Sequence, residues 1–253
     1  MEHHDPAVSV ITPAFNSAAT LLETIESVRQ QTFSEWEMIV VDDCSTDQTR
    51  DLLLKAKKQD ARIRPIFLER NSGAAVARNT ALDHAAGRYL AFLDSDDRWK
   101  PDKLEKQLRF MREHGYTFTF TGYEYISQDG TLLKKRVGAP RRVTYHDMLK
   151  NTIVGCLTVM IDRENTGHFH MPNLRTRQDL ATWLSLLKKG TVAYGLNETL
   201  AEYRIGGRAS ISRNKWKAAG KTWFVYRKVE NLNIWRAFWY FCHYAMHAVL
   251  KRF

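Results

Sequence analysis

Cysteine is scarce in this sequence, and no stretch of it is both long and uniformly hydrophobic. The three cysteines, Cys44, Cys156 and Cys242, lie far apart and show no Cys-x-x-Cys spacing. This spacing argues against a disulfide framework or a zinc site built on cysteine pairs, and it fits a reducing compartment. The first ten residues, MEHHDPAVSV, contain no basic segment followed by a long apolar run, so we expect no signal peptide.

The positive charge of the chain is concentrated at its C-terminal end. The formal net charge is +10, and residues 213–253 hold nine Lys or Arg against one Glu, which gives +8 and leaves +2 for the rest. Basic tails bind nucleic acid or anionic membranes, so the pattern of the tail must decide between these partners. With 253 residues, 44% of them hydrophobic, the chain can form one large α/β domain with an appendage.

Apolar and amphipathic segments alternate over the first 115 residues. The predicted strands cover residues 8–15, 36–43, 63–69 and 89–93, and the predicted helices cover residues 16–33, 45–60, 71–87 and 100–115. Ser45 and Gln48 predict a capping box at the start of the second helix. This order predicts an α/β fold with a Rossmann-like, mostly parallel sheet and helices on both faces.

The pattern changes after residue 115. Residues 116–126 alternate like an antiparallel strand and lead into a hairpin turn, and residues 153–161 predict another buried strand. A helix is predicted from Gln178, and residues 191–205 are typical of two short strands. His168 and His170 are interpreted as loop histidines, because the sequence suggests no third metal ligand nearby.

Polar residues follow four of the predicted strands, at residues 13–16, 42–43, 71–73 and 94–97. In parallel α/β sheets ligands bind beyond the carboxyl ends of the strands, so these residues are expected to converge. The last group, in YLAFLDSDDRW, places three carboxylates, Asp94, Asp96 and Asp97, within four positions. Two carboxylates about 4 Å apart repel by about 4 kcal/mol at an effective dielectric constant of 20, so the sequence predicts a bound cation.

Five segments in this order resemble those of the inverting family 2 glycosyltransferases, which have the GT-A fold. They are VSVITPAFN, VVDDCSTDQT, NSGAAVARN, FLDSDD and RQDLATW, and together they extend from residue 8 to about residue 212. The resemblance implies a nucleotide-sugar-binding half at residues 1–115 and an acceptor-binding half at residues 116–212. Residues 213–253 would then form a basic, aromatic helical tail.

The resemblance also implies roles for the acidic group. Asp96 would be the direct ligand of Mn²⁺ or Mg²⁺, and Asp94 would contact the ribose or donor sugar or bind the metal through water. Ser95 would lie against the donor, and Asp97 would orient the donor or a loop. The metal would stabilise the departing diphosphate. The alternative is that these acids form a solvated loop and cap a helix.

The same resemblance places the nucleotide. Asp43 would accept a hydrogen bond from the uracil N3–H, with Asp42 beside it, although helix capping at Asp43 or Ser45 would also account for one of the two acids. Pro13, Ala14 and Phe15 would line the base, while Phe15 could equally be a core residue.

The segment NSGAAVARN would approach the diphosphate. Asn71 belongs to its turn, Gly73 permits a close backbone approach, and Arg78 would reach the base or the diphosphate. The alternative for Arg78 is a surface ion pair with Asp83 or Glu69.

The resemblance makes Asp179 the general base that removes the proton of the acceptor hydroxyl. The family commonly has Glu where this chain has Gln178, which leaves the base intact and puts acceptor contacts in doubt. The alternative for Asp179 is an acid favoured by the helix dipole. Three late arginines are candidates for diphosphate contacts: Arg204, Arg208 and Arg213.

Residues 234–250 predict an amphipathic helix. Seventeen residues make a helix of about 25 Å, shorter than the ~30 Å hydrocarbon core of a bilayer, so we expect no membrane span. The predicted apolar stripe consists of Trp235, Phe238, Trp239, Cys242, Met246 and Val249. With its flanking cations the helix suits a membrane interface, although the stripe could instead pack on its own domain or on a second subunit. No recognised nucleic-acid motif is present.

Together these features predict a cytoplasmic glycosyltransferase, peripheral on the inner membrane through residues 213–253. It would transfer a sugar from a UDP-sugar to a saccharide or lipid-linked saccharide acceptor with inversion, in surface polysaccharide or lipooligosaccharide synthesis. A sugar nucleotidyltransferase, an aspartate-based phosphatase and a non-catalytic membrane adaptor remain alternatives. The sequence leaves open the sugar, the acceptor, the preferred metal and the oligomeric state.

Overall fold

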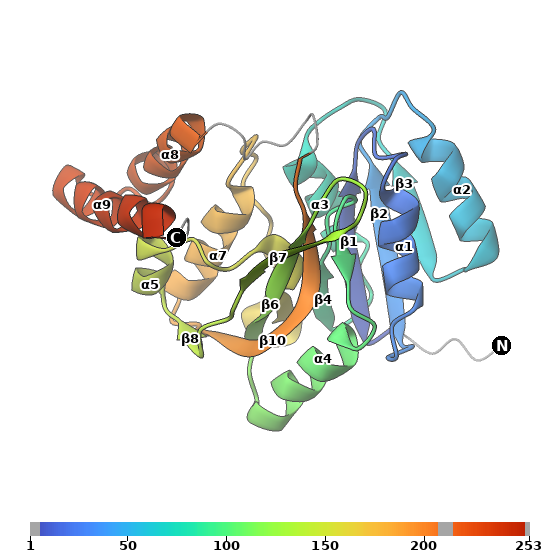
Figure 1. The fold of residues 1–253 in the computed structure, drawn as a ribbon, viewed down its shortest axis with the longest axis horizontal. Helices are drawn as coiled ribbons and strands as arrows, with labels where there is room; N and C mark the ends of the chain where they lie inside the picture. The colour runs from blue at the N-terminus through green and yellow to red at the C-terminus, as the bar shows by residue number, and fades with distance from the viewer. Residues whose placement is uncertain (1–5, 207–214, 251–253) are drawn as a thin grey trace.

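A computed structural model describes residues 6–206 and 215–250 of the chain (Figure 1). The strands are β1 Val8–Ala14, β2 Trp36–Asp42, β3 Ile63–Phe67, β4 Tyr89–Phe92, β5 Arg98–Trp99, β6 Phe118–Ile126, β7 Leu132–Val137, β8 Arg142–Val143, β9 Met160–Asp162 and β10 Ala193–Arg204. The helices are α1 Leu21–Arg29, α2 Thr49–Gln59, α3 Ala74–Asp83, α4 Lys103–His114, α5 Tyr145–Lys150, α6 Arg163–Thr166, α7 Gln178–Lys188, α8 Lys215–Phe224 and α9 Ile234–Leu250. A 3₁₀ turn, η1, covers Cys156–Thr158, and a π-helical turn, η3, covers Val225–Val229.

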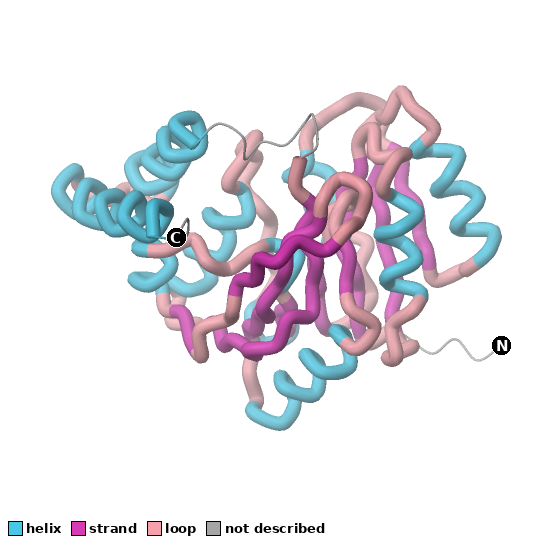
Figure 2. The backbone as a smooth tube through the Cα atoms, viewed as in Figure 1, coloured by secondary structure: helices cyan, strands magenta, loops and turns pink. Residues whose placement is uncertain are grey.

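One ten-stranded sheet runs through the molecule in the order β3-β2-β1-β4-β9-β6-β10-β5, with β7 paired to β6 and β8 to β10 (Figure 2). The strands β1, β2, β3 and β4 are parallel to their neighbours in this set, as β6 is to β10. Antiparallel pairs arise where β5, β7, β8 or β9 joins the sheet. The predicted α/β class with a mostly parallel sheet is confirmed.

Successive residues of each parallel strand point to opposite faces and build two cores. Val10, Met38 and Val40 pack with α1, α2 and α4, whereas Ile11 and Ile39 pack on the other face with α3 and α7. Both faces of this part of the sheet are covered by helices, which explains why its strands read as continuous apolar runs.

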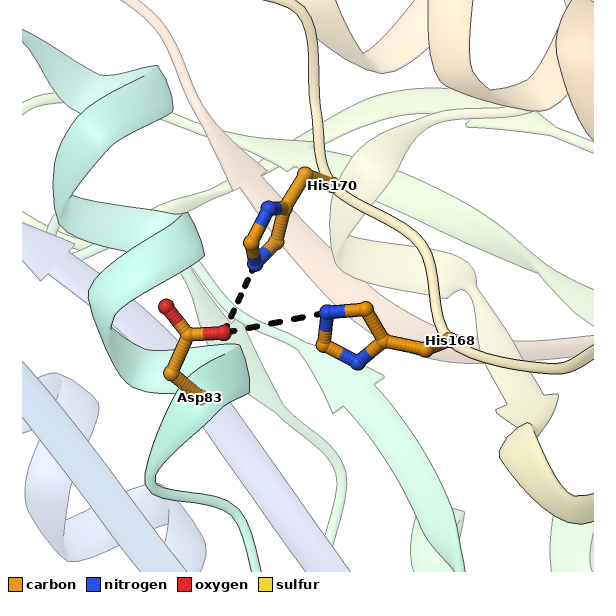
Figure 3. A group of neighbouring side chains, drawn as sticks. All are labelled: Asp83, His168 and His170. Atoms are coloured by element: carbon orange, nitrogen blue, oxygen red, sulfur yellow. Dashed lines mark hydrogen bonds and ion pairs between the residues drawn. The ribbon is translucent and has the colours of Figure 1, made fainter.

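The loop from residue 167 to residue 177 carries the chain from α6 to the start of α7, and it is fastened to α3. The side chain of Asn79 donates to the Met171 carbonyl at 2.8 Å and accepts from the Met171 amide at 2.8 Å. His170 Nε2 lies 2.7 Å from Asp83 Oδ1 at the last residue of α3 (Figure 3). The start of α7 is therefore held by contacts that the sequence alone does not reveal.

The C-terminal helices pack beside α5 and α7, at the end of the molecule away from β3 (Figure 1). Tyr145 donates to Glu230 at 2.7 Å, and Lys188 forms an ion pair with the same carboxylate at 3.1 Å. His146 and Tyr240 form a 2.6 Å hydrogen bond between α5 and α9. Among the described residues, the model contains no helix with the length and hydropathy needed to span a bilayer.

The exposed side chains of α9 contradict one of the alternatives for its apolar stripe. Trp235, Phe238 and Trp239 are 81%, 58% and 60% exposed, and Cys242 and Met246 are exposed as well. Ala237 on the opposite side is fully buried. The idea that the aromatic stripe packs on its own domain is therefore wrong for its described members. Lys251, the cation that follows the helix, lies outside the described residues.

Candidate active site

A pocket of about 780 Å³ opens beyond the carboxyl ends of β1, β2 and β4. Its lining includes nine of the predicted site residues: Pro13, Ala14, Phe15, Asp43, Arg78, Asp94, Ser95, Asp96 and Asp179. These residues come from the ends of β1, β2 and β4, from α3 and from α7, so three of the four predicted polar groups converge on the pocket. Phe15 is 47% exposed within this pocket, and the alternative that it is a core residue is wrong.

Three predicted residues do not line the pocket and lie behind Asp43. The two carboxylate oxygens of Asp43 accept from the amides of Ser72 and Gly73, each at 2.7 Å. Asn71 donates to the Asp43 carbonyl at 3.2 Å, and Asp42 accepts from the Ser45 amide at 3.2 Å. Gly73 has φ 92°, which a residue with a side chain rarely adopts. Asp43 thus holds the turn that precedes α3, while it also faces the pocket. The predicted alternative, a side-chain cap at the start of the helix after β2, is not formed.

The acidic turn is held by the segment that enters α1. Ser95 Oγ lies 2.8 Å from Ser17 Oγ, and the Ser95 carbonyl accepts from Thr20 Oγ1 at 2.9 Å. The Asp97 carbonyl accepts from Thr24 Oγ1 at 2.8 Å. These bonds satisfy the backbone of a buried turn and leave the Asp94 and Asp96 carboxylates facing the pocket.

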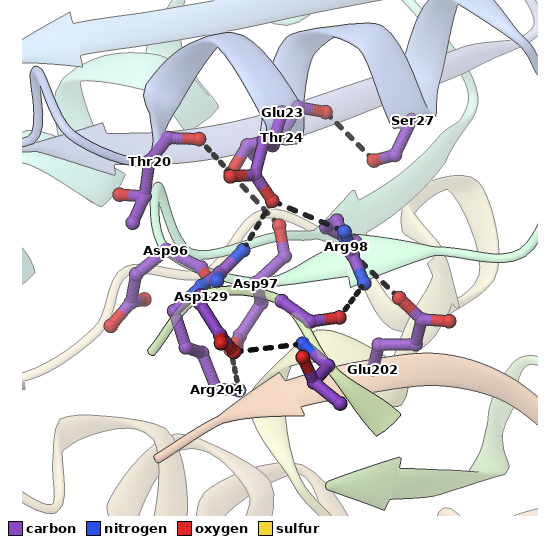
Figure 4. Close-up of polar contacts among 12 residues, drawn as sticks. Thr20, Glu23, Thr24, Ser27, Asp96, Asp97, Arg98, Asp129, Glu202 and Arg204 are labelled. Atoms are coloured by element: carbon purple, nitrogen blue, oxygen red, sulfur yellow. Dashed lines mark hydrogen bonds and ion pairs between the residues drawn. The ribbon is translucent and has the colours of Figure 1, made fainter. Parts of the chain in front are cut away.

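Arg204, at the end of β10, clamps the same turn from the opposite side (Figure 4). Its amide donates to Asp97 Oδ1 at 2.8 Å and its Nε donates to the Asp96 carbonyl at 2.7 Å. Its two terminal nitrogens donate to the Gln128 carbonyl at 2.8 Å and to Glu23 at 2.7 Å. Since its guanidinium is occupied by protein partners, Arg204 positions the acids. The other two candidates, Arg208 and Arg213, lie outside the described residues.

Arg78 is buried and forms an ion pair with Asp94. Burial lowers the pKa of Arg78, but the attraction of Asp94 outweighs it and leaves the pKa raised. The predicted alternative partners were Asp83 and Glu69, and the pairing with Asp94 corrects them. The Nε and Nη1 atoms of Arg78 are buried and have no hydrogen-bond partner among the described residues, a costly state unless a ligand pairs with them.

The electrostatics of the acidic turn favour a bound cation. Burial and the charge of Asp94 raise the pKa of Asp96 to about 6. Burial, Asp96 and Asp94 also raise the pKa of Asp97. Asp97 is 1% exposed and bonded to Arg204, which leaves Asp94 and Asp96 as the acids of this turn that line the pocket. Carboxylate oxygens are ligands that Mg²⁺ and Mn²⁺ prefer, so the residues fit such an ion.

Asp179 lies in the first turn of α7, on the pocket wall contributed by the second half of the chain. The preceding Arg177 has φ 66° and donates to the Tyr244 hydroxyl of α9 at 3.1 Å. Asp179 and the acidic residues Asp94 and Asp96 therefore line the same pocket.

Three basic residues that line the pocket were not predicted from the sequence. Arg175, Arg177 and Lys221 line the pocket, and none of them pairs with a carboxylate among the described residues. Lys221 belongs to α8, so the tail contributes directly to the pocket. Arg177 is the first residue of the RQD segment and Arg175 lies two positions before it, and that proximity to Asp179 was the available signal.

The family model described as Glycosyl transferase family 2 matches residues 9–169. The chain belongs to glycosyltransferase family 2. It is 62% identical over 252 residues to the putative teichuronic acid biosynthesis glycosyltransferase TuaG of Bacillus subtilis (strain 168), covering 100% of both chains. It is 40% identical over 222 residues to the Escherichia coli enzyme WfgD, a UDP-Glc:α-D-GlcNAc-diphosphoundecaprenol β-1,3-glucosyltransferase, covering 87% of this chain and 85% of WfgD.

Solved structures share the fold of this glycosyltransferase. TarS 1–349 of S. aureus, solved with UDP-GlcNAc, has a TM-score of 0.69 at 22% identity, covering 91% of this chain and 69% of that one. The mannosyltransferase PcManGT of Pyrobaculum calidifontis, solved with GDP-Man and Mn²⁺, has a TM-score of 0.69 at 20% identity, covering 91% and 66%. The predicted GT-A fold is confirmed, and family membership favours a glycosyltransferase over the nucleotidyltransferase and phosphatase alternatives.

Proposed function

We propose that this glycosyltransferase moves a sugar from a UDP-sugar to a lipid-linked saccharide with inversion at the anomeric carbon. Mn²⁺ or Mg²⁺ assists it, and it works at the cytoplasmic face of the membrane in surface polysaccharide synthesis. The observation that carries the proposal is the pocket wall made by Arg78, Asp94 and Asp96. It joins a buried guanidinium with two unpaired nitrogens to two carboxylates that face the pocket.

The donor would lie between the β1 end and this wall. A metal held by Asp96 and Asp94 would neutralise charge on the departing diphosphate. The unpaired Nε and Nη1 of Arg78 would donate to oxygens of the donor, because buried donors without partners are costly. Phe15 offers its exposed ring to the base and Asp43 faces the pocket beside it. The UDP-Glc in the name of WfgD supports uridine as the nucleotide.

Asp179 would act as the general base. Its carboxylate accepts the proton of the acceptor hydroxyl while that oxygen attacks the anomeric carbon from the face opposite the leaving diphosphate. The bond to the diphosphate breaks as the new glycosidic bond forms, so the configuration inverts. The presence of the Asp179 carboxylate in the same pocket as the proposed donor site supports this role.

The acceptor would enter along the side of the pocket that carries Arg175, Arg177 and Lys221, called here the basic wall. Arg175, Arg177 and Lys221 provide positive charge for a phosphorylated acceptor, and guanidinium groups match phosphate oxygens well. The Arg177–Tyr244 hydrogen bond ties this wall to α9, whose exposed aromatic residues suit a membrane interface. The diphosphoundecaprenol acceptor in the name of WfgD supports a lipid-linked substrate, and the name of TuaG supports a role in a surface polysaccharide.

Calorimetric titration tests the donor site. Wild type and Asp96→Ala would be titrated with UDP, GDP and CMP, with and without Mn²⁺. We expect Mn²⁺-dependent binding of UDP that is lost in Asp96→Ala and weak binding of the other nucleotides. Glu105→Ala, a change of a surface acid on α4, is the matched control and leaves UDP affinity unchanged. Folded wild type that binds no nucleotide would contradict the proposal and favour the non-catalytic adaptor.

A further inference from the structure

A second group of potential metal ligands lies outside the pocket, on the loop that precedes α7. The sequence suggests no third ligand near His168 and His170, but the fold brings Asp83 to them from the last residue of α3 (Figure 3). One ligand atom from each of the three residues lies within 4.8 Å of the others. All three side chains are exposed, so an ion can reach them from solvent.

The placement of the two histidines follows from the local chain. They alternate around Phe169, which packs against the hydrophobic core. Both Nε2 atoms point toward the same oxygen, Asp83 Oδ1, at 2.7 Å for His170 and 3.9 Å for His168. The imidazole rings lie with centroids 4.7 Å apart and planes at 71°, so the rings do not stack face to face.

These distances suit a tetrahedral transition metal ion. Zinc binds imidazole nitrogen at about 2.0–2.1 Å and carboxylate oxygen at about 2.0–2.2 Å, so two ligands on one tetrahedral ion lie about 3.3 Å apart. The observed separations of 2.7 Å and 3.9 Å bracket that value. Because these side chains are exposed, small rotations bring their ligand atoms to this separation of about 3.3 Å. Two neutral imidazoles and one carboxylate, with water in the fourth position, form a set typical of zinc rather than of magnesium.

We propose that Asp83, His168 and His170 form a zinc-class metal site that fastens the 167–177 loop to α3. This site is separate from the donor site, because Asp83, His168 and His170 do not line the pocket. Arg78 is the last residue of α3 that lines the pocket, and Asp83 lies five residues further along, about 7.5 Å at 1.5 Å per residue. The loop leads into the turn that carries Arg175, Arg177 and Asp179, so the metal would stabilise the acceptor side of the enzyme.

Calorimetric titration with ZnCl₂ tests the site on metal-stripped full-length protein. His3 and His4 are also adjacent in the sequence, so His3→Ala/His4→Ala serves as the parent chain. Excess MgCl₂ occupies the oxygen ligands of the acidic turn, since Mg²⁺ competes poorly for imidazole. We expect one zinc ion per chain, and at least a 30-fold weaker affinity in each of His168→Gln, His170→Gln and Asp83→Asn. His114→Gln, a change of an exposed histidine on α4, is the matched control and leaves zinc affinity unchanged.

A second measurement tests the fastening of the loop. We expect saturating zinc to raise the Tm of the parent chain by about 5 °C and to slow amide hydrogen exchange in residues 167–177, with neither effect in His168→Gln. Absence of a zinc ion in the parent chain would overturn the proposal. So would a zinc affinity that all three substitutions leave unchanged, and so would binding without slower exchange in this loop. None of these readouts depends on nucleotide binding or transfer.

Discussion

If Asp96 holds the metal as proposed, its pKa links metal binding to pH. Burial and the charge of Asp94 raise its pKa to about 6, and only its ionised form binds a metal. A proton therefore competes with Mn²⁺ as the pH falls through 6, and the affinity for Mn²⁺ should fall about tenfold between pH 7.5 and pH 5. Titration of Mn²⁺ at several pH values measures this. An equal affinity for Mn²⁺ at the two pH values would contradict the proposed role of Asp96.

Lys103 is a fully buried lysine that the site does not use. Burial lowers its pKa to about 7, and its ammonium group has Gln107 Oε1 at 2.7 Å and the Trp99 ring at 4.1 Å. Between pH 7 and about 10.5 the unfolded chain binds more protons here than the folded one, so this group makes stability rise with pH. Below pH 7 the full cost of a buried charge is present.

Replacing this lysine should therefore stabilise the fold. We expect Lys103→Met to increase the free energy of unfolding at pH 7 by about 1–3 kcal/mol, with the gain shrinking toward pH 10. Urea unfolding at pH 7 and pH 9.5 measures both effects. Lys57→Met, on the exposed side of α2, is the control and should change neither value. Destabilisation at both pH values would show that the Lys103–Gln107 hydrogen bond outweighs the cost of burial.

At the scale of elements, the end of β10 acts as the clamp of the acidic turn. Arg204 has a side chain 2% exposed, and it binds Asp96, Gln128 and Glu23 at once. Arg204→Met would remove the side-chain donor to the Asp96 and Gln128 carbonyls and leave Glu23 paired with Arg98, and we expect a loss of about 3 kcal/mol, which lowers Tm by about 6–12 °C. Arg136→Met removes an ion pair whose arginine side chain is 73% exposed, and it should cost less than about 1 kcal/mol because Lys100 still pairs with the partner, Glu124. Equal Tm values for the two variants, from thermal unfolding, would contradict the clamp.

The sequence predicted which helices and strands exist better than it predicted where they begin and end. The expected capping box at Ser45 and Gln48 is absent, because α2 begins at Thr49 and Ser45 Oγ accepts from the Asn16 amide at 2.8 Å instead. The two short strands expected at 191–205 form the single strand β10, whose register shifts near Thr199 interrupt the pattern of alternation. The strand expected at 153–161 is reduced to the short β9 after a 3₁₀ turn. In each case a partner distant in sequence decides the local structure.

Some residues of the candidate site were predictable from the sequence and others were not. Residues at strand ends were predictable, since topology alone brings Phe15, Asp43 and Asp96 to one edge of a parallel sheet. The pairing of Arg78 with Asp94 and the approach of Lys221 from the tail depend on side-chain packing across distant segments. The periodicity of a sequence does not indicate such contacts. For the same reason, the sequence did not indicate that Asp83 lies beside His168 and His170.

At the scale of the whole molecule, the exposed aromatic face of α9 is expected to dock the enzyme on a membrane. Trp235→Ser/Phe238→Ser/Trp239→Ser removes three exposed side chains and should weaken binding to phosphatidylglycerol vesicles about 100-fold. Affinity for UDP should stay the same, because these residues do not line the pocket. Flotation with such vesicles measures the effect.

The matched control for docking is Leu54→Ser/Leu132→Ser, which removes exposed apolar side chains from α2 and β7. We expect it to bind vesicles as the wild type does. If both variants lose binding equally, docking is not a property of α9. If neither variant loses binding, the aromatic face serves another purpose.

The central claim is tested most directly by the stereochemistry of the product and its dependence on Asp179. The assay combines a UDP-sugar panel that begins with UDP-glucose, Mn²⁺, and a GlcNAc-diphosphate acceptor with a short lipid chain. The anomeric configuration of the product is then read by proton NMR. We predict a β-linked product from the α-linked donor, and at least a 1000-fold slower transfer by Asp179→Asn with unchanged UDP affinity. An α-linked product, or a transfer rate that Asp179→Asn leaves unchanged, would contradict the account.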